Sequence, residues 1–138
     1  MNLRKLASLG SIVFGTILIL GAIGTWTMVS SMLADQNITT PEDACLPERE
    51  VDGPFTAYCQ ATIIDKHALN STDGLRYAEL DREDPRRATA MNASFLQSSL
   101  FTSVLAFGVA AMAGGMGVLF VLIGLGIRDV SEHVAEVR

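Results

Sequence analysis

Hydrophobic and polar residues divide this chain into two long apolar stretches with a polar section between them. The second apolar stretch, residues 88–127, has about forty residues without a charged side chain, and arginines close it on both sides. Roughly 20 apolar helical residues already cross the hydrocarbon core of a bilayer. The stretch is therefore long enough for a transmembrane helix with further helix attached to it.

The most apolar part of this stretch, residues 100–127, is predicted to be the transmembrane segment. Residues 85–99 are predicted to continue the same helix outside the bilayer as a stalk. Asp84 suits the N-cap position and Pro85 the first helical position, and no glycine interrupts the pattern before Gly108. At 1.5 Å per residue, such a helix of some 40 residues would be about 60 Å long.

The first apolar stretch follows Arg4 and Lys5 and remains uncharged until Asp35, which predicts a transmembrane helix over residues 7–33. A cleaved signal peptide is the alternative, but its apolar core is usually only about 7–15 residues long. The single tryptophan, Trp26, falls towards the end of this helix. It is expected to anchor the outer membrane interface, with a packed or lipid-facing indole as the alternative.

The charges that flank the two predicted spans indicate their orientation. Arg4, Lys5 and Arg128 place the N-terminus, residues 1–6, and the tail, residues 128–138, in the cytoplasm by the positive-inside rule. The section between the spans, residues 34–84, then lies outside. The pattern predicts a multi-pass protein of the cell membrane with both termini cytoplasmic and an extracytoplasmic central loop.

Both cysteines, Cys45 and Cys59, fall in the polar middle section. Outside the cytoplasm a disulfide is the expected state of such a pair, and a loop of about 15 residues closed in this way contributes on the order of 3 kcal/mol. Two unpaired thiols are the alternative. A catalytic redox pair is disfavoured because the Cys-X-X-Cys spacing is absent.

The middle section is predicted to be mostly helical. After Gly53-Pro54, apolar positions such as Phe55, Cys59 and Ile63 recur at helical spacing, and a turn signal follows at residues 70–74. A strand is the alternative, although its alternation is not clean. The expected fold is an all-α membrane protein: a two-helix transmembrane hairpin with a small, disulfide-stapled extracytoplasmic domain.

Small residues recur about every four positions in both predicted spans, which lets helix backbones approach closely inside a bilayer. The members of this predicted packing seam are Ala7, Ser11 and Gly15 on the first helix and Ala106, Ala110, Ala113, Gly114 and Gly117 on the second. One face of the second helix would serve the hairpin and another a partner helix. Alternatively, the small residues are only typical span composition, and Gly114-Gly115 is a site for a mild kink.

Composition and motifs exclude several classes of function. The chain of 138 residues is 49% hydrophobic and carries a net charge of −5, with acidic groups in excess between Asp35 and Arg87. Nucleic acid needs a basic surface instead. The sequence contains no P-loop, Gly-x-Ser-x-Gly or His-Glu-x-x-His motif, and no ionisable group lies inside either predicted span. We therefore expect no catalytic residues, no metal and no cofactor.

Three segments carry a resemblance to a family: GPFTAYCQATIIDKHAL (residues 53–69), YAELDREDPRRAT (77–89) and SFLQSSLFTSVLAFGVAAM (94–112). In these segments the chain resembles a group of short actinobacterial membrane proteins with two spans around an extracytoplasmic loop. Some members are labelled aromatic ring-opening dioxygenase. Such chemistry commonly needs iron held by two histidines and a carboxylate. The only histidines, His67 and His133, are predicted to lie on opposite sides of the membrane, so the label does not fit this chain.

Two functions of different classes remain. The first is a non-enzymatic accessory or scaffold subunit, which associates through its helices with a larger membrane complex or with itself. The second is an extracytoplasmic module that binds or senses a ligand and is anchored by two spans. The first is favoured because the cytoplasmic tail after Arg128 has only about ten residues.

Overall fold

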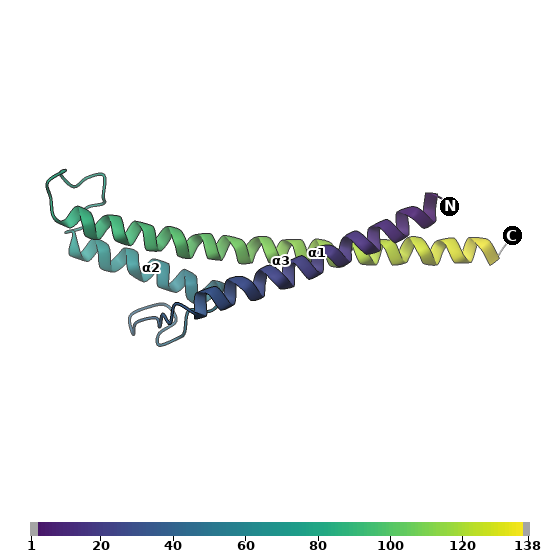
Figure 1. Ribbon diagram of the computed structural model, residues 1–138, viewed down its shortest axis with the longest axis horizontal. Helices are drawn as coiled ribbons and strands as arrows, with labels where there is room; N and C mark the ends of the chain where they lie inside the picture. Colours follow the sequence, from purple (N-terminus) through teal and green to yellow (C-terminus); the bar gives the residue numbers. More distant parts are fainter. Residues whose placement is uncertain (1–2, 137–138) are drawn as a thin grey trace. The chain divides into compact units, whose positions relative to one another are not determined.

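The computed structural model describes residues 3–136, and their side chains as far as Val130. Its helices are α1 (Leu3–Ala34), α2 (Pro54–Ser71) and α3 (Arg86–Glu136) (Figure 1). In the described residues, β-structure is limited to an isolated antiparallel bridge between Thr39 and Glu50. The predicted all-helical fold is therefore confirmed, including the helix rather than strand that follows Gly53.

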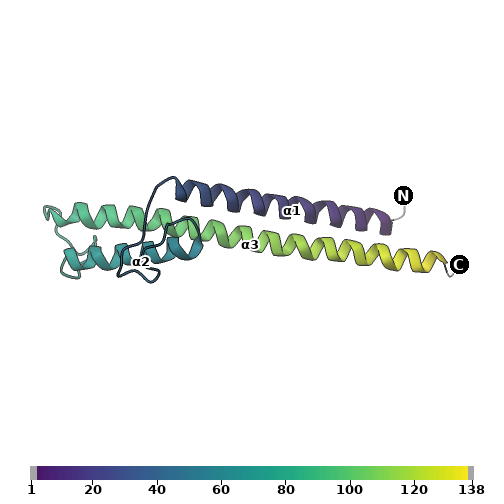
Figure 2. The same cartoon turned by 90° about the horizontal axis from the view of Figure 1, so that it is seen from below.

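The chain divides into two compact units, and α1 and α3 each contribute to both. The two-helix unit comprises the segments Met1–Thr27 and Gly108–Arg138, and within it α1 lies alongside α3 (Figure 2). The middle unit, Met28–Phe107, contains the end of α1, all of α2 and the first part of α3. Within this unit α2 lies along α3 (Figure 1).

Both long helices have the length and composition of membrane spans. The candidate segments are Leu3–Ala34 and Arg86–Val130, and in their most apolar windows only 11% and 17% of the residues are buried. Large apolar side chains such as Ile17, Leu20 and Leu119 are 59–64% exposed. A core helix of a soluble protein would bury most of these side chains, so the exposed surface of the two helices is unusually apolar.

The middle unit has a small hydrophobic core that joins all of its elements. Its largest fully buried members are Val51, from the irregular segment after α1, and Phe107 of α3, which are 0% and 1% exposed. The other buried members come from α1, α2 and α3: Leu33, Ala57, Ala61 and Leu100. Because each element contributes, the unit folds around one shared core.

The irregular segment between α1 and α2 is held together by a buried threonine and a disulfide. The Thr40 hydroxyl accepts a hydrogen bond from the Arg49 backbone N–H at 2.9 Å and donates to the Leu46 carbonyl oxygen. The predicted bridge between Cys45 and Cys59 is present, with the two Cα atoms 5.4 Å apart. This bridge ties the irregular segment to α2.

Local residues explain where α2 and α3 begin and end. The Thr56 hydroxyl accepts a hydrogen bond from the Gly53 backbone N–H at 3.2 Å, next to Pro54 at the start of α2. α2 ends at Ser71, after which Asp73 and Gly74 lie in the left-handed region with φ of +54° and +82°, and the Gly74 backbone N–H donates to the Leu69 carbonyl oxygen at 2.8 Å. At the start of α3, Asp84 Oδ1 accepts from the Arg86 backbone N–H at 2.8 Å, which agrees with the cap expected there.

Candidate functional site

In the two-helix unit, α1 and α3 approach each other closely at a pair of glycines. A Cβ atom added to Gly15 would lie 2.5 Å from the Gly117 carbonyl oxygen, and one added to Gly117 would lie 2.7 Å from the Gly15 carbonyl oxygen. Both distances are far below an ordinary van der Waals contact. Only glycine therefore fits at these two positions without movement of the backbones.

Serine side chains connect the same two helices by hydrogen bonds. Ser8 Oγ donates to the Gly124 carbonyl oxygen and Ser11 Oγ to the Phe120 carbonyl oxygen, each at 2.7 Å. The Phe120 ring also meets the Phe14 ring edge to face, with centroids 5.1 Å apart. The seam thus combines backbone packing with polar contacts that would keep their strength in an apolar surrounding.

The structure places the residues of the predicted seam in different surroundings. Gly114 faces α1, where an added Cβ would come within 3.3 Å of the Ala22 Cβ, and Ala110 is 3% exposed. Ala113 is half-buried. Ala7 is exposed and borders a hollow with Ile123, Gly126 and neighbouring residues. Ala106 is half-buried and belongs to the middle unit.

The seam also contains residues that the sequence analysis missed. Ser8 is 6% exposed, and a Cβ on Gly124 would lie 2.8 Å from the Ser8 carbonyl oxygen. The available signal was a repeat of seven rather than four: small residues lie at positions 8, 15 and 22 of α1 and at 110, 117 and 124 of α3. A seven-residue repeat is typical of helices that remain in contact over several turns.

A second set of small residues on α3 remains open. No described neighbouring atom lies within 4 Å of the position that a Cβ would take on Gly108, Gly115 or Gly126. Ala111, four residues before Gly115, is exposed. Ala111 and Gly115 line a shallow groove of about 320 Å³. Trp26 of α1, which is 40% exposed, lines the same groove. We call Gly108, Ala111, Gly115 and Gly126 the open face of α3.

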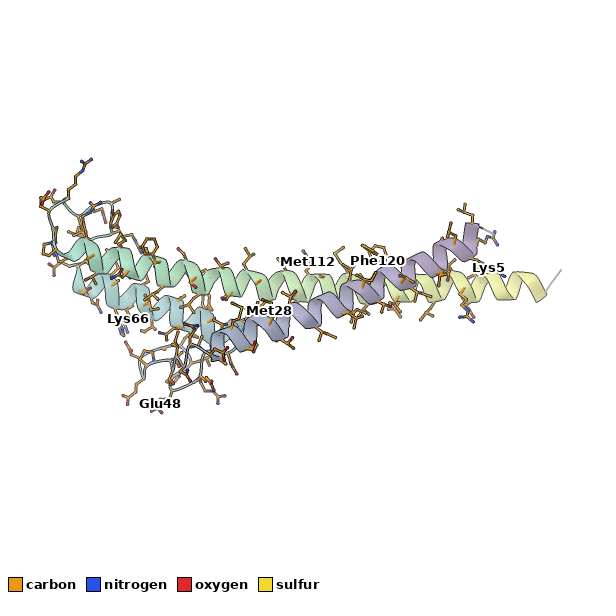
Figure 3. All side chains as sticks on the ribbon, viewed as in Figure 1. Lys5, Met28, Glu48, Lys66, Met112 and Phe120 are labelled. Atoms are coloured by element: carbon orange, nitrogen blue, oxygen red, sulfur yellow. A yellow bond between two sulfur atoms is a disulfide. The ribbon has the colours of Figure 1, made fainter. Side chains whose placement is uncertain are left out.

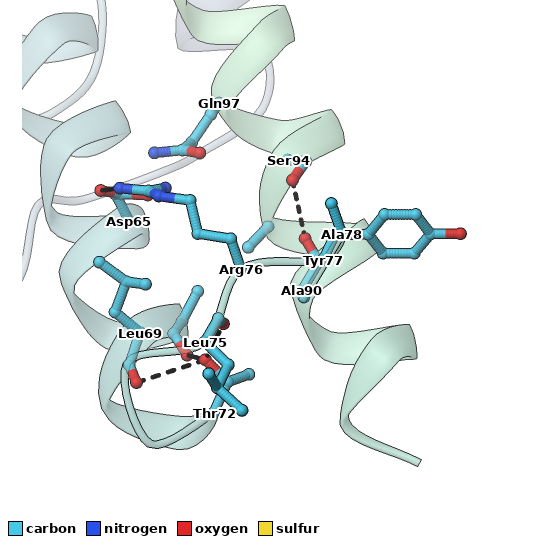
Figure 4. Close-up of a pocket in the computed structure, with 12 residues that line it drawn as sticks. Asp65, Leu69, Thr72, Leu75, Arg76, Tyr77, Ala78, Ala90, Ser94 and Gln97 are labelled. Carbon is cyan, nitrogen blue, oxygen red and sulfur yellow. Dashed lines mark hydrogen bonds and ion pairs between the residues drawn. The ribbon is translucent and has the colours of Figure 1, made fainter. Parts of the chain in front are cut away.

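The middle unit contains a hollow of about 250 Å³ between α2, the connection to α3 and α3 itself (Figure 4). Its polar wall is an ion pair in which Arg76 Nη1 lies 2.8 Å from Asp65 Oδ1 and Arg76 Nη2 lies 3.2 Å from Asp65 Oδ2. The remaining lining is mainly small or apolar: Ala68, Leu69, Thr72, Leu75, Tyr77, Ala78, Ala90, Ala93, Ser94 and Gln97.

The ion pair sets the charge state of the hollow. The hydrogen bonds from the Arg76 guanidinium hold the pKa of Asp65 below its usual value of 3.8, and Asp65 raises the pKa of Arg76 in return. Asp65 is therefore ionised at neutral pH and is already paired. A paired carboxylate of this kind suits the recognition of polar groups better than the transfer of a proton.

A second charged cluster joins α2 to the irregular segment. Lys66 Nζ and His67 Nε2 each lie 3.0 Å from Asp43 Oδ2, and the hydrogen bond from Lys66 is the main cause of the lowered pKa of Asp43. Figure 3 shows Lys66 on the side of α2 next to the segment that carries Glu48. His67 thus has a carboxylate partner, and the His133 side chain lies outside the described side chains. In the described part of the chain, no three His, Cys, Asp or Glu residues are grouped as metal ligands would be.

No protein-family model, curated protein or solved structure matches this chain. The resemblance to two-span actinobacterial membrane proteins therefore stays a prediction.

Proposed function

We propose that α1 and α3 cross a cell membrane, with both termini in the cytoplasm and the middle unit outside. The proposal is supported by the exposed apolar surface of both helices and by the positions of Arg4, Lys5 and Arg128. The Cys45–Cys59 disulfide agrees with an oxidising compartment for the middle unit. α3 has 51 residues, about 75 Å at 1.5 Å per residue, so part of it would extend beyond a bilayer core of about 30 Å.

Within that membrane, we propose that the protein is a non-enzymatic accessory or scaffold subunit. The observation that carries this proposal is the open face of α3. One set of small residues, including Gly117 and Gly124, is covered by α1, whereas Gly108 and Gly115 have no described neighbour within 4 Å of their Cβ positions. Lipid chains gain little from small residues, but a second helix can pack closely on them. The open face is therefore suited to a partner helix.

Co-purification in mild detergent tests this role. The variant Gly115→Leu should keep the protein at its normal abundance and abolish recovery of a larger complex or of a homo-oligomer. The matched control is Leu119→Ala, since Leu119 is exposed on the same helix and is already a large apolar residue. A complex that survives Gly115→Leu would contradict a docking role for the open face.

A second candidate, a ligand-binding module, is favoured by the hollow beside Asp65 and Arg76. A volume of about 250 Å³ approaches the lower limit of small-molecule sites, and a fixed ion pair could orient a polar ligand. Replacing Ala93, which lines the hollow, with Leu would then abolish ligand-induced thermal stabilisation. It should leave co-purification unchanged, so this result separates the two candidates.

A further inference from the structure

Four large apolar side chains gather on one exposed surface of the middle unit. Phe55 and Tyr58 of α2 are 77% and 51% exposed, and Phe101 and Leu105 of α3 are 41% and 67% exposed. We call these four residues the aromatic patch. A soluble domain of this small size would gain by covering them, so their exposure indicates contact with something apolar.

Contacts between α2 and α3 bring the members of the patch together. Gln97 Nε2 donates to the Ala61 carbonyl oxygen at 3.1 Å, and the Tyr58 and Phe101 rings meet at an angle of 64° with centroids 6.1 Å apart. The two helices run antiparallel. Phe55, one turn before Tyr58, therefore lies on the same side as Leu105, one turn after Phe101.

The surroundings of the patch are free of charge on both helices. α2 has no charged residue from Pro54 to Ile64, and α3 has none from Ala88 to Ile127. The polar residues of these two segments are uncharged and carry hydroxyl or amide groups, as in Thr62, Ser98 and Gln97. A protein-docking surface is usually rimmed by charged groups that select the partner, and that rim is missing from these two helical segments.

We propose that the aromatic patch inserts into the headgroup region of the outer leaflet and seats the middle unit on the membrane. This inference deepens the proposed function, because it assumes that α3 crosses the bilayer. Its α3 members, Phe101 and Leu105, lie at the outer end of the predicted transmembrane segment, residues 100–127, and α3 continues from them through that segment without a break. Aromatic residues are enriched at this depth, where a ring can lie among acyl chains and the Tyr58 hydroxyl can reach water.

Fluorescence quenching by brominated phosphatidylcholine tests the insertion. The full-length protein has one tryptophan, Trp26, which reports on the proposed first span. In a Trp26→Phe background, Phe55→Trp places a probe in the patch. Tyr77→Trp is the matched control, because Tyr77 is an exposed aromatic residue of the same unit. The centroid of its ring lies 4.0 Å from the guanidinium carbon of Arg87.

In vesicles with bromines near the headgroup end of the acyl chains, we expect the Phe55→Trp probe to lose emission and shift to shorter wavelength. The Tyr77→Trp probe should be unaffected. If Trp26 of the unmodified protein is quenched and the Phe55→Trp probe is not, the insertion is wrong while the span remains. If neither is quenched, the proposed spans themselves are wrong.

Two further outcomes would also overturn the insertion. Equal quenching of the Phe55→Trp and Tyr77→Trp probes would mean that the membrane contact is not specific to the patch. A blue shift without quenching, in a protein that migrates as an oligomer, would mean that a protein covers the patch. Tyr58→Trp serves as a second probe if Phe55→Trp loses the helical circular dichroism of the parent protein.

Discussion

Gly15 and Gly117 face each other across the two long helices, and each leaves less than 3 Å between its missing Cβ and the carbonyl oxygen of the other. No side chain can enter this contact, so the backbones themselves form the interface. On the side of this contact towards the start of α1, Ser8 and Ser11 donate hydrogen bonds to carbonyl oxygens of α3. Close packing and hydrogen bonds are the forces available to helices in lipid, where hydrophobic burial contributes little.

Replacing Gly117 with alanine should therefore destabilise the two-helix unit. The added methyl group would meet the Gly15 carbonyl oxygen at 2.7 Å, and overpacking of this kind costs about 1–3 kcal/mol. Unfolding in mixed detergent micelles, followed by circular dichroism, measures the change. Gly115→Ala is the matched control, since no described neighbour lies within 4 Å of its Cβ position. Equal effects of the two variants would show that the Gly15–Gly117 contact does not determine stability.

Loss of the disulfide should destabilise the middle unit. The bridge joins the irregular segment at Cys45 to the buried Cys59 of α2, and removal of such a bridge from a small domain typically costs about 2–5 kcal/mol. Thermal unfolding of a Cys45→Ser/Cys59→Ser variant measures the loss. Labelling of the untreated protein by a maleimide, without prior reduction, would instead mean that the thiols are free in the cell.

Acid should weaken the middle unit through Asp65. Arg76 holds the pKa of Asp65 below its usual value of 3.8, so the folded state favours the ionised carboxylate. The resulting stability is present above pH 4 and is lost as the pH falls below about 4 through the lowered pKa. We expect Asp65→Asn to reduce the difference in urea unfolding between pH 6 and pH 3.

The matched control for this experiment is Asp81→Asn, because Asp81 is exposed and does not line the hollow. This variant should retain the acid sensitivity of the parent protein. The Asp65–Arg76 ion pair would not contribute to stability if Asp65→Asn and Asp81→Asn had the same pH dependence.

The proposed orientation predicts the behaviour of reporter fusions. A reporter active only in the cytoplasm should work at either terminus and fail when it is inserted after Asp73, in the exposed turn that follows α2. The matching periplasm-type reporter should give the opposite pattern. Activity of the cytoplasmic reporter after Asp73 would reverse the orientation inferred from Arg4, Lys5 and Arg128.

The sequence by itself determined the helices and the disulfide of this protein. An uncharged run such as residues 88–127 leaves few alternatives to a long helix, and the spacing of Phe55, Cys59 and Ile63 predicts the helix that the structure shows as α2. These features depend on local periodicity and on caps such as Asp84, which a sequence displays directly. The disulfide could also be predicted from the sequence, because the chain has only two cysteines and both fall in the polar middle section.

Only the tertiary structure decided which faces of the helices meet. Four-residue spacing of small residues suggested a seam through Ala7, but the register of the two antiparallel helices brings Ser8 to Gly124. Likewise, Asp65 and Arg76 lie on different elements, and their pairing depends on the path of the chain around Gly74. Register and chain path result from contacts between distant segments, and local sequence periodicity does not contain that information.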